Sequence, residues 1–392
     1  MYYKQNIWEF TANYLNNYFE VTTDQICGSR YTSSHGNFVK VNDFSNYCGH
    51  VNFHKVNFLS FKHLFAKIQK NVSKYNVDFI SYIKYHDEVI NIGEGLTDRR
   101  NYGYIKISFK DEENNIDTFD INCSIKDDYC DLEDQILLCV NQYCKKRRLI
   151  DNKSIKKMTF ADVPVVFSPL ASGYFIHEIL GHLLEEDIFK SCNYNLGKLN
   201  ISCKLTILDK IDGVGQYIGL NKYDDKGNKI SPLMLIEKGK LRNIMAVNSD
   251  NSIDNVLYGF ERRENFKHNA QPRMRCTLVQ PFDSLNKNDI ITKYKKAILL
   301  DRVYYGFINP KDISYTLKGN GYLIENGEIV NYIGNITLVG ELLKDLNKVK
   351  YVGNDLEFNT SDCIKFGQIV RVGMMTPTIS ISDSFIRGEC YS

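Results

Sequence analysis

The sequence predicts an α+β fold in two parts, an N-terminal α/β domain of residues 1–150 and a strand-rich C-terminal domain of residues 151–392 that begins with a helix. A length of 392 residues suits two domains of ordinary size. Helical spacing of apolar residues is concentrated in the first half, whereas strand alternation and hairpin turns dominate the second. With 43% hydrophobic residues, the chain can bury a sizeable core.

Strands and helices alternate in the N-terminal domain. Residues 36–41 and 104–109 alternate apolar and polar side chains, which is the pattern of half-buried strands. Residues 61–75 and 131–148 repeat apolar side chains every three to four positions, which predicts two helices. The second helix ends in the basic run 145–148, and cations stabilise the C-terminal end of a helix dipole. We therefore interpret this run as a solvated helix end and not as a nucleic-acid contact.

The C-terminal domain is expected to open with a strand that leads directly into a helix. Residues 163–167 form a short apolar run typical of a buried strand. Ser168 then offers an N-cap and Pro169 suits the first helical position. We therefore expect a helix that includes residues 171–187.

Two similar segments later in the chain predict β-hairpins. Residues 235–241 and 323–329 each place a two-residue turn, Lys-Gly or Asn-Gly, between apolar runs. Such pairs favour the left-handed backbone of tight hairpin turns. The C-terminal domain is therefore expected to consist mostly of strands.

The composition gives no sign of nucleic-acid or membrane binding. Lys+Arg 49 and Asp+Glu 47 leave a formal net charge of +2, whereas nucleic-acid binders carry a basic surface. The start of the chain lacks an apolar signal core, and the longest apolar stretch, residues 163–176, is too short to span a bilayer. We therefore expect a cytoplasmic protein in which most cysteines are packed thiols.

The helix predicted over residues 171–187 carries a His-Glu-x-x-x-His pattern. His177 and His182 are five positions apart, whereas the familiar zinc-protease pattern separates its histidines by four. At about 100° per residue, a regular helix leaves side chains five positions apart at about 140° to each other. A one-residue π-bulge would return them to one face, and Gly181 is a place where the backbone can yield. A shared metal therefore requires a local distortion of the helix.

The pattern alone leaves the role of the histidines open. Two histidines on an apolar helix also suit hydrogen-bonded core residues. A catalytic zinc site takes three protein ligands and a water molecule, so a third ligand is needed. From the residues alone, that ligand is Glu185, Glu186, Asp187 or a cysteine from elsewhere in the chain.

Several blocks within residues 155–388 resemble, in the same order, those of the TldD/PmbA family of metallopeptidases, often described as modulators of DNA gyrase. The blocks that carry the resemblance are residues 166–185, 223–227, 262–268, 272–274, 323–327, 352–355, 362–368 and 377–378. Residues 1–150 resemble the family weakly. The ordered series makes the resemblance specific to the C-terminal domain.

The resemblance implies a zinc peptidase with one Zn²⁺ per chain. It implies that His177, His182 and Cys363 are the ligands, and that Glu178 is the general base. Two imidazoles and one thiolate form a donor set suited to zinc rather than to manganese or iron, with a fourth position left for water.

The resemblance also points to residues beside the catalytic cleft. Arg263 and His268 would bind the substrate there, although a structural salt bridge is an equal alternative for Arg263. The chain departs from the family pattern at residues 304–311, where the family carries a glycine-rich stretch. It departs again at residues 361–364, which read Ser-Asp-Cys-Ile instead of Gly-Thr-Cys-Gly. The first departure is expected to affect substrate preference, and the second to affect how closely Cys363 is kept in the ligand geometry.

The function implied by the resemblance is hydrolysis of unstructured peptides, such as leader peptides, modified peptides or an antitoxin. It implies a channel enclosed by a homodimer or by a heterodimer with a paralogue, to which residues 1–150 contribute. Two other hypotheses are a non-catalytic binding subunit and a cysteine hydrolase that uses Cys363 with a histidine base. Bound zinc would distinguish the peptidase from a non-catalytic binding subunit. Loss of activity on chelation would distinguish it from a cysteine hydrolase.

Overall fold

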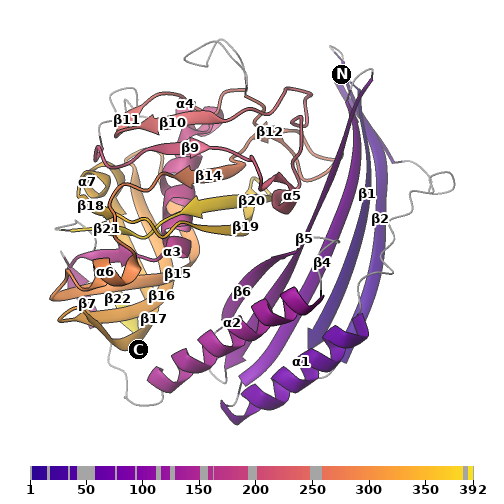
Figure 1. The fold of residues 1–392 in the computed structure, drawn as a ribbon. Coiled ribbons are helices and arrows are strands. Elements are labelled where there is room, and N and C mark those ends of the chain that lie inside the picture. The colour runs from indigo at the N-terminus through magenta and orange to yellow at the C-terminus, as the bar shows by residue number, and fades with distance from the viewer. Residues whose placement is uncertain are drawn as a thin grey trace.

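The computed structural model describes residues 2–15, 18–33, 36–41, 58–75, 77–92, 95–111, 116–123, 129–150, 158–161, 163–192, 201–247, 258–382 and 387–391. Within these ranges the strands form three large sheets and a two-stranded ribbon, with fewer helices (Figure 1). The predicted α+β class is confirmed. No helix among the described residues is long and apolar enough to cross a membrane.

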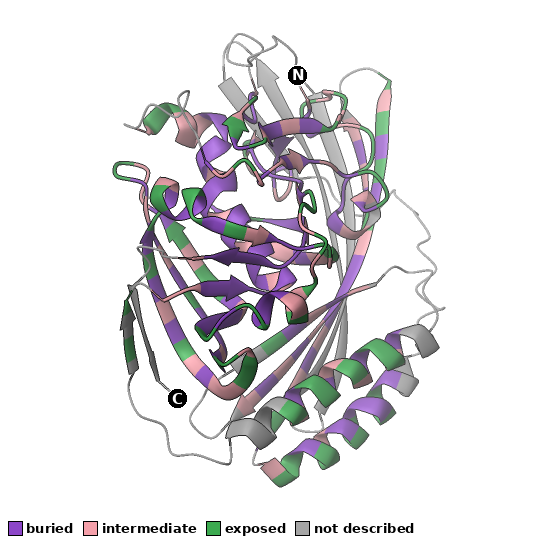
Figure 2. Cartoon of the chain, turned by 60° about the vertical axis from the view of Figure 1, so that its left-hand side comes forward, coloured by how far each residue is buried: buried purple, intermediate pink, exposed green. Residues whose placement is uncertain are grey.

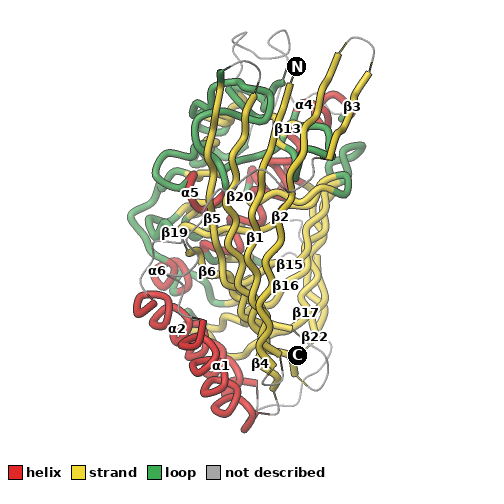
Figure 3. Tube along the Cα trace, turned by 90° about the vertical axis from the view of Figure 1, so that its right-hand side faces the viewer, coloured by secondary structure: helices red, strands yellow, loops and turns green. Residues whose placement is uncertain are grey.

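The first sheet is formed by antiparallel strands in the order β3-β2-β1-β4-β5-β6. Its strands are β1 (Tyr2–Leu15), β2 (Tyr18–Ser33), β3 (Gly36–Val41), β4 (Val77–Ile92), β5 (Leu96–Asp111) and β6 (Ile116–Cys123). Helix α1 (Phe58–Val72), a 3₁₀ turn (Ser73–Tyr75) and helix α2 (Tyr129–Ile150) complete this part. The two helices lie together at one end of the long strands (Figure 3). The strands predicted at 36–41 and 104–109 and both predicted helices are confirmed.

An aromatic core joins these two helices to one face of the first sheet. Phe65 of α1 lies 5.4 Å, between ring centroids, from Phe79 of β4, which lies 5.7 Å from Phe109 of β5. Tyr143 of α2 stacks on Phe109 at 4.0 Å. All four rings are buried. The apolar residues that repeat with helical spacing in the sequence therefore lie on the faces of α1 and α2 that pack against the sheet.

Two further sheets build the C-terminal part. One has the order β11-β10-β9-β14-β20-β19 and the other β18-β21-β8-β15-β16-β17-β22-β7. The strands of the first are β9 (Ile207–Asp209), β10 (Leu233–Glu237), β11 (Lys240–Leu241), β14 (Cys276–Val279), β19 (Glu357–Lys365) and β20 (Gln368–Thr376). Those of the second are β7 (Met158–Ala161), β8 (Val165–Phe167), β15 (Lys296–Ile308), β16 (Ser314–Glu325), β17 (Glu328–Glu341), β18 (Val349–Val352), β21 (Ile379–Ile381) and β22 (Arg387–Tyr391). The ribbon is β12 (Glu261–Arg262) with β13 (Gln271–Pro272), and short helices are α5 (Gly215–Ile218), α6 (Lys287–Ile291) and α7 (Leu342–Asn347).

Both predicted hairpins form tight turns in this part. The turn between β10 and β11 has φ of 47° at Lys238 and 78° at Gly239. The turn between β16 and β17 has φ of 51° at Asn326 and 81° at Gly327. Two consecutive left-handed residues match the twist of paired strands, so both predicted hairpins are confirmed.

A helical segment lies buried between the two C-terminal sheets. It consists of α3 (Pro169–Phe175), a π-helical turn (Ile176–Gly181) and a 3₁₀ turn (His182–Leu184), and α4 (Glu186–Ser191) follows. Its side chains share one core with both sheets (Figure 2). Members of this core include Phe175, Ile179 and Leu183 of the helix, Leu235 of one sheet and Leu317 of the other. The segment that carries the histidines is thus packed against both sheets.

Candidate metal centre

The helix that carries the histidines begins as the sequence predicts. The Ser168 hydroxyl accepts a hydrogen bond from the backbone N–H of Ala171, and Pro169 occupies the first helical position. The same hydroxyl donates to the backbone carbonyl of Asp301 at 2.7 Å. Because Asp301 lies in β15, this N-cap both starts the helix and fixes it to the neighbouring sheet.

The predicted distortion of the helix is present between the two histidines. Residues Ile176–Gly181 form a π-helical turn, and the backbone N–H of His182 donates to the carbonyl of His177, five residues earlier. This wider turn brings the two side chains to one face. Gly181 itself has ordinary helical angles, φ −58° and ψ −53°. Its role is steric, because a Cβ atom there would lie 2.0 Å from the Met274 sulfur.

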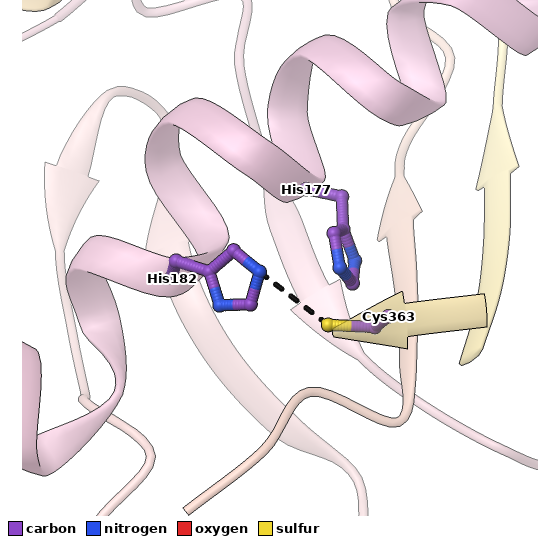
Figure 4. A group of neighbouring side chains, drawn as sticks. All are labelled: His177, His182 and Cys363. Atoms are coloured by element: carbon purple, nitrogen blue, oxygen red, sulfur yellow. Dashed lines mark hydrogen bonds between the residues drawn. The ribbon is translucent and has the colours of Figure 1, made fainter. Parts of the chain in front are cut away.

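His177, His182 and Cys363 converge at one point (Figure 4). One candidate ligand atom from each residue lies within 4.8 Å of the other two. The Cys363 Sγ lies 3.4 Å from the His182 Nε2, and the two imidazole rings meet edge-to-face with centroids 5.0 Å apart. Cys363 comes from β19, 181 residues after His182, so tertiary folding assembles the cluster.

The surroundings of His177 fit a bound metal ion. Both of its ring nitrogens are buried and have no hydrogen-bond partner among the described residues. A buried imidazole without a partner is costly, and a metal ligand bond would satisfy it. Two imidazoles and one thiolate are donors that zinc accepts in three-ligand sites.

The electrostatics of the cluster favour a negative charge on Cys363 and a positive charge on His182. Burial alone would lower the pKa of His182, but the neighbouring Glu185 and Cys363 raise it well above its usual value. Burial alone would raise the pKa of Cys363, yet the two imidazoles hold it well below the usual thiol value. The thiol is therefore poised as a thiolate, the form that binds metals.

Glu185 has a role that the sequence analysis did not identify. Its carboxylate is fully buried and lies 2.9 Å from the His182 Nδ1, on the side of the ring away from Cys363. It also accepts hydrogen bonds from the Met274 N–H at 3.1 Å and the Lys365 ammonium at 2.8 Å. Burial would raise its pKa, but His182 and Lys365 lower it to about 2. A carboxylate here fixes the tautomer and direction of the imidazole.

The three acidic candidates for a third ligand therefore lie outside the cluster. Glu185 interrupts the predicted helix 171–187 with extended angles, φ −73° and ψ 133°, which turn the chain away. Glu186 accepts hydrogen bonds from the Val247 N–H and from Lys190. Asp187 pairs with Lys365 at 2.7 Å. The sequence did offer a signal for the contact between Glu185 and His182, because side chains three positions apart meet on a helix.

Glu178 faces the cluster from the helix. Its Oε2 lies 3.8 Å from the His182 Nε2, and about a quarter of its side chain is exposed. Burial raises the pKa of Glu178, and the two imidazoles only partly oppose this. Strand β15 passes directly beside it, since a Cβ atom at Gly306 would lie 2.6 Å from the Glu178 Cβ. Glu178 is thus held between the cluster and β15.

Arg263 and His268 lie outside the cluster of candidate ligands. The Arg263 side chain is buried, and its Nη2 donates to the carbonyl of Asp225 at 2.9 Å. Asp225 also pairs with Arg100 of the first sheet at 2.5 Å. These contacts suit the structural alternative, and substrate binding by Arg263 stays a prediction. The backbone N–H of the half-buried His268 donates to Asn265, and its role in substrate binding stays a prediction.

Comparison with known proteins agrees with the sequence blocks. The family model for the PmbA/TldA metallopeptidase C-terminal domain matches residues 161–388, more than half of the chain. A metalloprotease of Methanothermobacter thermautotrophicus is 30% identical over 236 residues, which cover 57% of this chain and 50% of that protein. A zinc metalloprotease TldD homolog of Saccharolobus solfataricus is 26% identical over 252 residues, 62% of this chain and 55% of that protein. The chain spans about half the length of these curated relatives.

The fold of the chain is similar to that of a solved structure. The crystal structure of TldE from Thermococcus kodakarensis matches with a TM-score of 0.70 and 14% sequence identity. The match covers 98% of this chain and 96% of that chain, so it includes the N-terminal part, which the family model does not reach. On the extent of the family-model match, this chain belongs to the PmbA/TldD metallopeptidase family.

Proposed function

We propose that this chain is a zinc-dependent peptidase that binds one Zn²⁺ and hydrolyses peptide bonds in unstructured peptides. The observation that carries the proposal is the convergence of His177, His182 and Cys363 around the unpartnered ring nitrogens of His177. Relatives at 26% and 30% identity are named metalloproteases, which supports it.

The chain's own residues have distinct roles in this proposal. Zinc bound in such a site would activate a water molecule and polarise the scissile carbonyl. His177, His182 and Cys363 would hold the ion, and Glu185 fixes the direction of His182. Glu178 accepts a proton from the attacking water and delivers it to the leaving amine. Its raised pKa suits this work, because a base with a pKa closer to neutrality is also a better acid afterwards.

Apolar side chains are exposed on the two segments that carry or approach the centre. Tyr304 and Phe307 are exposed on β15, near the glycine that approaches Glu178. Ile364 is exposed on the face of β19 opposite to Cys363, and Phe366 is exposed in the turn that follows. An exposed apolar surface in this region would support a peptide substrate. These segments are the ones in which the chain departs from the family pattern, so we propose a preference for apolar peptide side chains.

We further propose that the active form is a homodimer or a heterodimer with a paralogue. The support is the family resemblance and the match of the whole chain to the TldE fold. An enclosed site would exclude folded proteins and admit leader peptides or other modified peptides. Light scattering of the purified chain, alone and with a paralogue, tests this assembly.

One geometric observation favours a second candidate, a cysteine hydrolase. Cys363, His182 and Glu185 form a thiol–imidazole–carboxylate series with distances of 3.4 Å and 2.9 Å. This is the order of a catalytic triad. The triad leaves His177 and Glu178 without a function, however, and its sulfur is buried at 4% exposure. A metal site uses all five residues, so we prefer it.

The decisive experiment is elemental analysis of the protein purified without chelator, beside His182→Ala and Cys363→Ala. We expect about one zinc per wild-type chain, as three protein ligands and a water imply, and none in the variants. Peptide hydrolysis should stop on chelation and return with zinc. Activity that survives chelation but not thiol alkylation would establish the triad. A wild-type chain free of metal and of activity would indicate the non-catalytic binding subunit.

A further inference from the structure

The strand that carries Cys363 is held by hydrogen bonds at that residue and at positions shortly before it. The Tyr174 hydroxyl of α3 is 2.7 Å from the hydroxyl of Ser361, and Thr360 is hydrogen-bonded to Asn122 of β6. The Cys363 carbonyl accepts from a buried arginine, Arg273, at 2.6 Å. The position of the sulfur is therefore set by several elements beyond the helix with the histidines.

Asp362 makes a charged contact from this strand to the first sheet. Its carboxylate lies 2.5 Å from the Lys106 ammonium of β5 and 3.2 Å from the Arg371 guanidinium of β20. Arg371 also pairs with Asp120 of β6 at 3.1 Å and lies over the ring of Tyr104 of β5 at 4.2 Å. The network therefore links β5 and β6 of the first sheet to both strands of the β19–β20 hairpin.

The order of residues in β19 gives this network a direct effect on the sulfur. Successive side chains of a strand point to opposite faces, so Asp362 and Cys363 face opposite ways. One side chain binds the first sheet while its neighbour faces His177 and His182. A zinc site tolerates only small errors in ligand position, of roughly 0.2 Å. A shift of Asp362 therefore moves the thiolate by a distance that matters to the metal.

We propose that the N-terminal sheet positions the metal-binding thiolate, with Lys106 and Asp362 as positioning residues of the centre. The proposal rests on the zinc site proposed above. In this proposal the metal site is held in place by the N-terminal sheet as well as by the C-terminal sheets. The link is an ion pair between residues 256 positions apart. Neither residue touches the metal, and both act through the placement of Cys363.

Lys106→Met tests the proposal, with zinc affinity measured by competition with a chelator. We expect the zinc affinity to fall about three- to tenfold. This lies between the small effect of losing a part-exposed ion pair and the larger effect of losing a residue that orients a metal ligand. Lys106→Arg, which keeps the charge, should restore most of the affinity. Asp362→Asn should weaken zinc binding too. The double variant should lose less zinc affinity than the two single variants combined, because both changes remove the same contact between Lys106 and Asp362.

Arg302→Met is the matched control. Arg302 of β15 also reaches the first sheet, through a hydrogen bond of 2.9 Å to the Thr118 carbonyl and contact with Phe119, but not through the Cys363 strand. It should leave zinc affinity unchanged. Cobalt loaded in place of zinc gives a second readout, the thiolate-to-metal charge-transfer band. We expect Lys106→Met to change this band while metal-free thermal stability stays close to that of Arg302→Met.

The outcomes separate this proposal from the one it rests on. Wild-type affinity and an unchanged cobalt band in Lys106→Met would overturn the positioning role alone. Equal losses in Lys106→Met and Arg302→Met would also overturn it, because they would show a general effect of sheet docking. A wild-type chain that binds neither zinc nor cobalt would overturn both proposals.

Discussion

Glu178 is the residue whose chemistry depends most directly on the proposed mechanism. We expect Glu178→Gln to lower kcat/KM for peptide hydrolysis by about 100- to 10,000-fold, the usual effect of losing a general acid–base group. Zinc content should stay at the wild-type level, because the carboxylate faces the ligands without being one of them. Steady-state kinetics and elemental analysis on one preparation provide both measurements.

The exposed Glu328, in the β16–β17 hairpin, gives the control. Glu328→Gln makes the same chemical change far from the centre in sequence and should leave both quantities unchanged. Wild-type turnover in Glu178→Gln would exclude this residue as the base. Loss of zinc together with activity would instead assign it a role in holding the ion.

Glu185 supports a second prediction at the scale of one residue. Glu185→Gln should weaken zinc binding about 10- to 100-fold, because the carboxylate that orients His182 is lost. The change also removes one partner of the buried Lys365, so stability is expected to fall as well. Chelator competition reports the first effect and thermal unfolding of the metal-free protein reports the second.

Asp187→Asn separates the two effects. Asp187 pairs with the same lysine at 2.7 Å, whereas the carboxylate beside His182 in the described part of the chain is that of Glu185. We expect it to lower stability without a comparable loss of zinc affinity. Equal affinity losses in both variants would mean that Lys365, and not the orientation of His182, controls metal binding.

At the scale of elements, the centre depends on how closely β15 and the π-helical turn approach each other. A Cβ atom at Gly306 would lie 2.6 Å from both the Cβ and the Cγ of Glu178, closer than side-chain atoms pack. Gly306→Ala should therefore displace Glu178 and lower kcat/KM by about 100-fold, the cost expected for an error of roughly 1 Å. Zinc content should be retained, since the ligands lie on other residues.

Lys318→Ala is the control for this strand pair. Lys318 is exposed on β16, where it pairs in register with Tyr305, the residue before Gly306. Activity close to wild type is expected. Full activity in Gly306→Ala would show that the strand can move aside and that its approach to Glu178 is not required.

A fourth prediction, at the scale of the whole molecule, concerns the effect of metal on stability. The three proposed ligands come from a helix and a strand separated by 181 residues, so we expect zinc to bind only the folded chain with this geometry. Zinc at about 1,000 times its Kd should stabilise the fold by about 4 kcal/mol. Differential scanning calorimetry with and without chelator measures the change in Tm. Cys363→Ser should reduce or abolish the difference, and an equal zinc effect in that variant would place the ion elsewhere.

Much of the local structure could be predicted because it depends on neighbouring residues. The helices at 61–75 and 131–148 follow from apolar spacing, and the hairpin turns at 238–239 and 326–327 follow from residues that accept left-handed angles. The π-helical turn between His177 and His182 was predictable for another reason, since two ligands five positions apart require it. The break at Glu185 was not predictable from its neighbours, because the extended residue contacts distant ones: its backbone forms a β-bridge with Met245, and its carboxylate accepts from Lys365.

The sequence by itself determined the elements, the histidine spacing and the family to which the chain belongs, since these rest on short-range periodicity and on ordered blocks. The resemblance of residues 362–368 to the family also named Cys363 as the partner of the histidines, whereas only the tertiary structure decided what holds the cluster in place. Glu185 behind His182, Gly306 against Glu178 and Lys106 on Asp362 are assigned by contacts alone. Except for Glu185, these contacts join residues far apart in the chain. Burial between packed sheets brings such residues together, and no local pattern encodes which distant glycine or lysine will meet them.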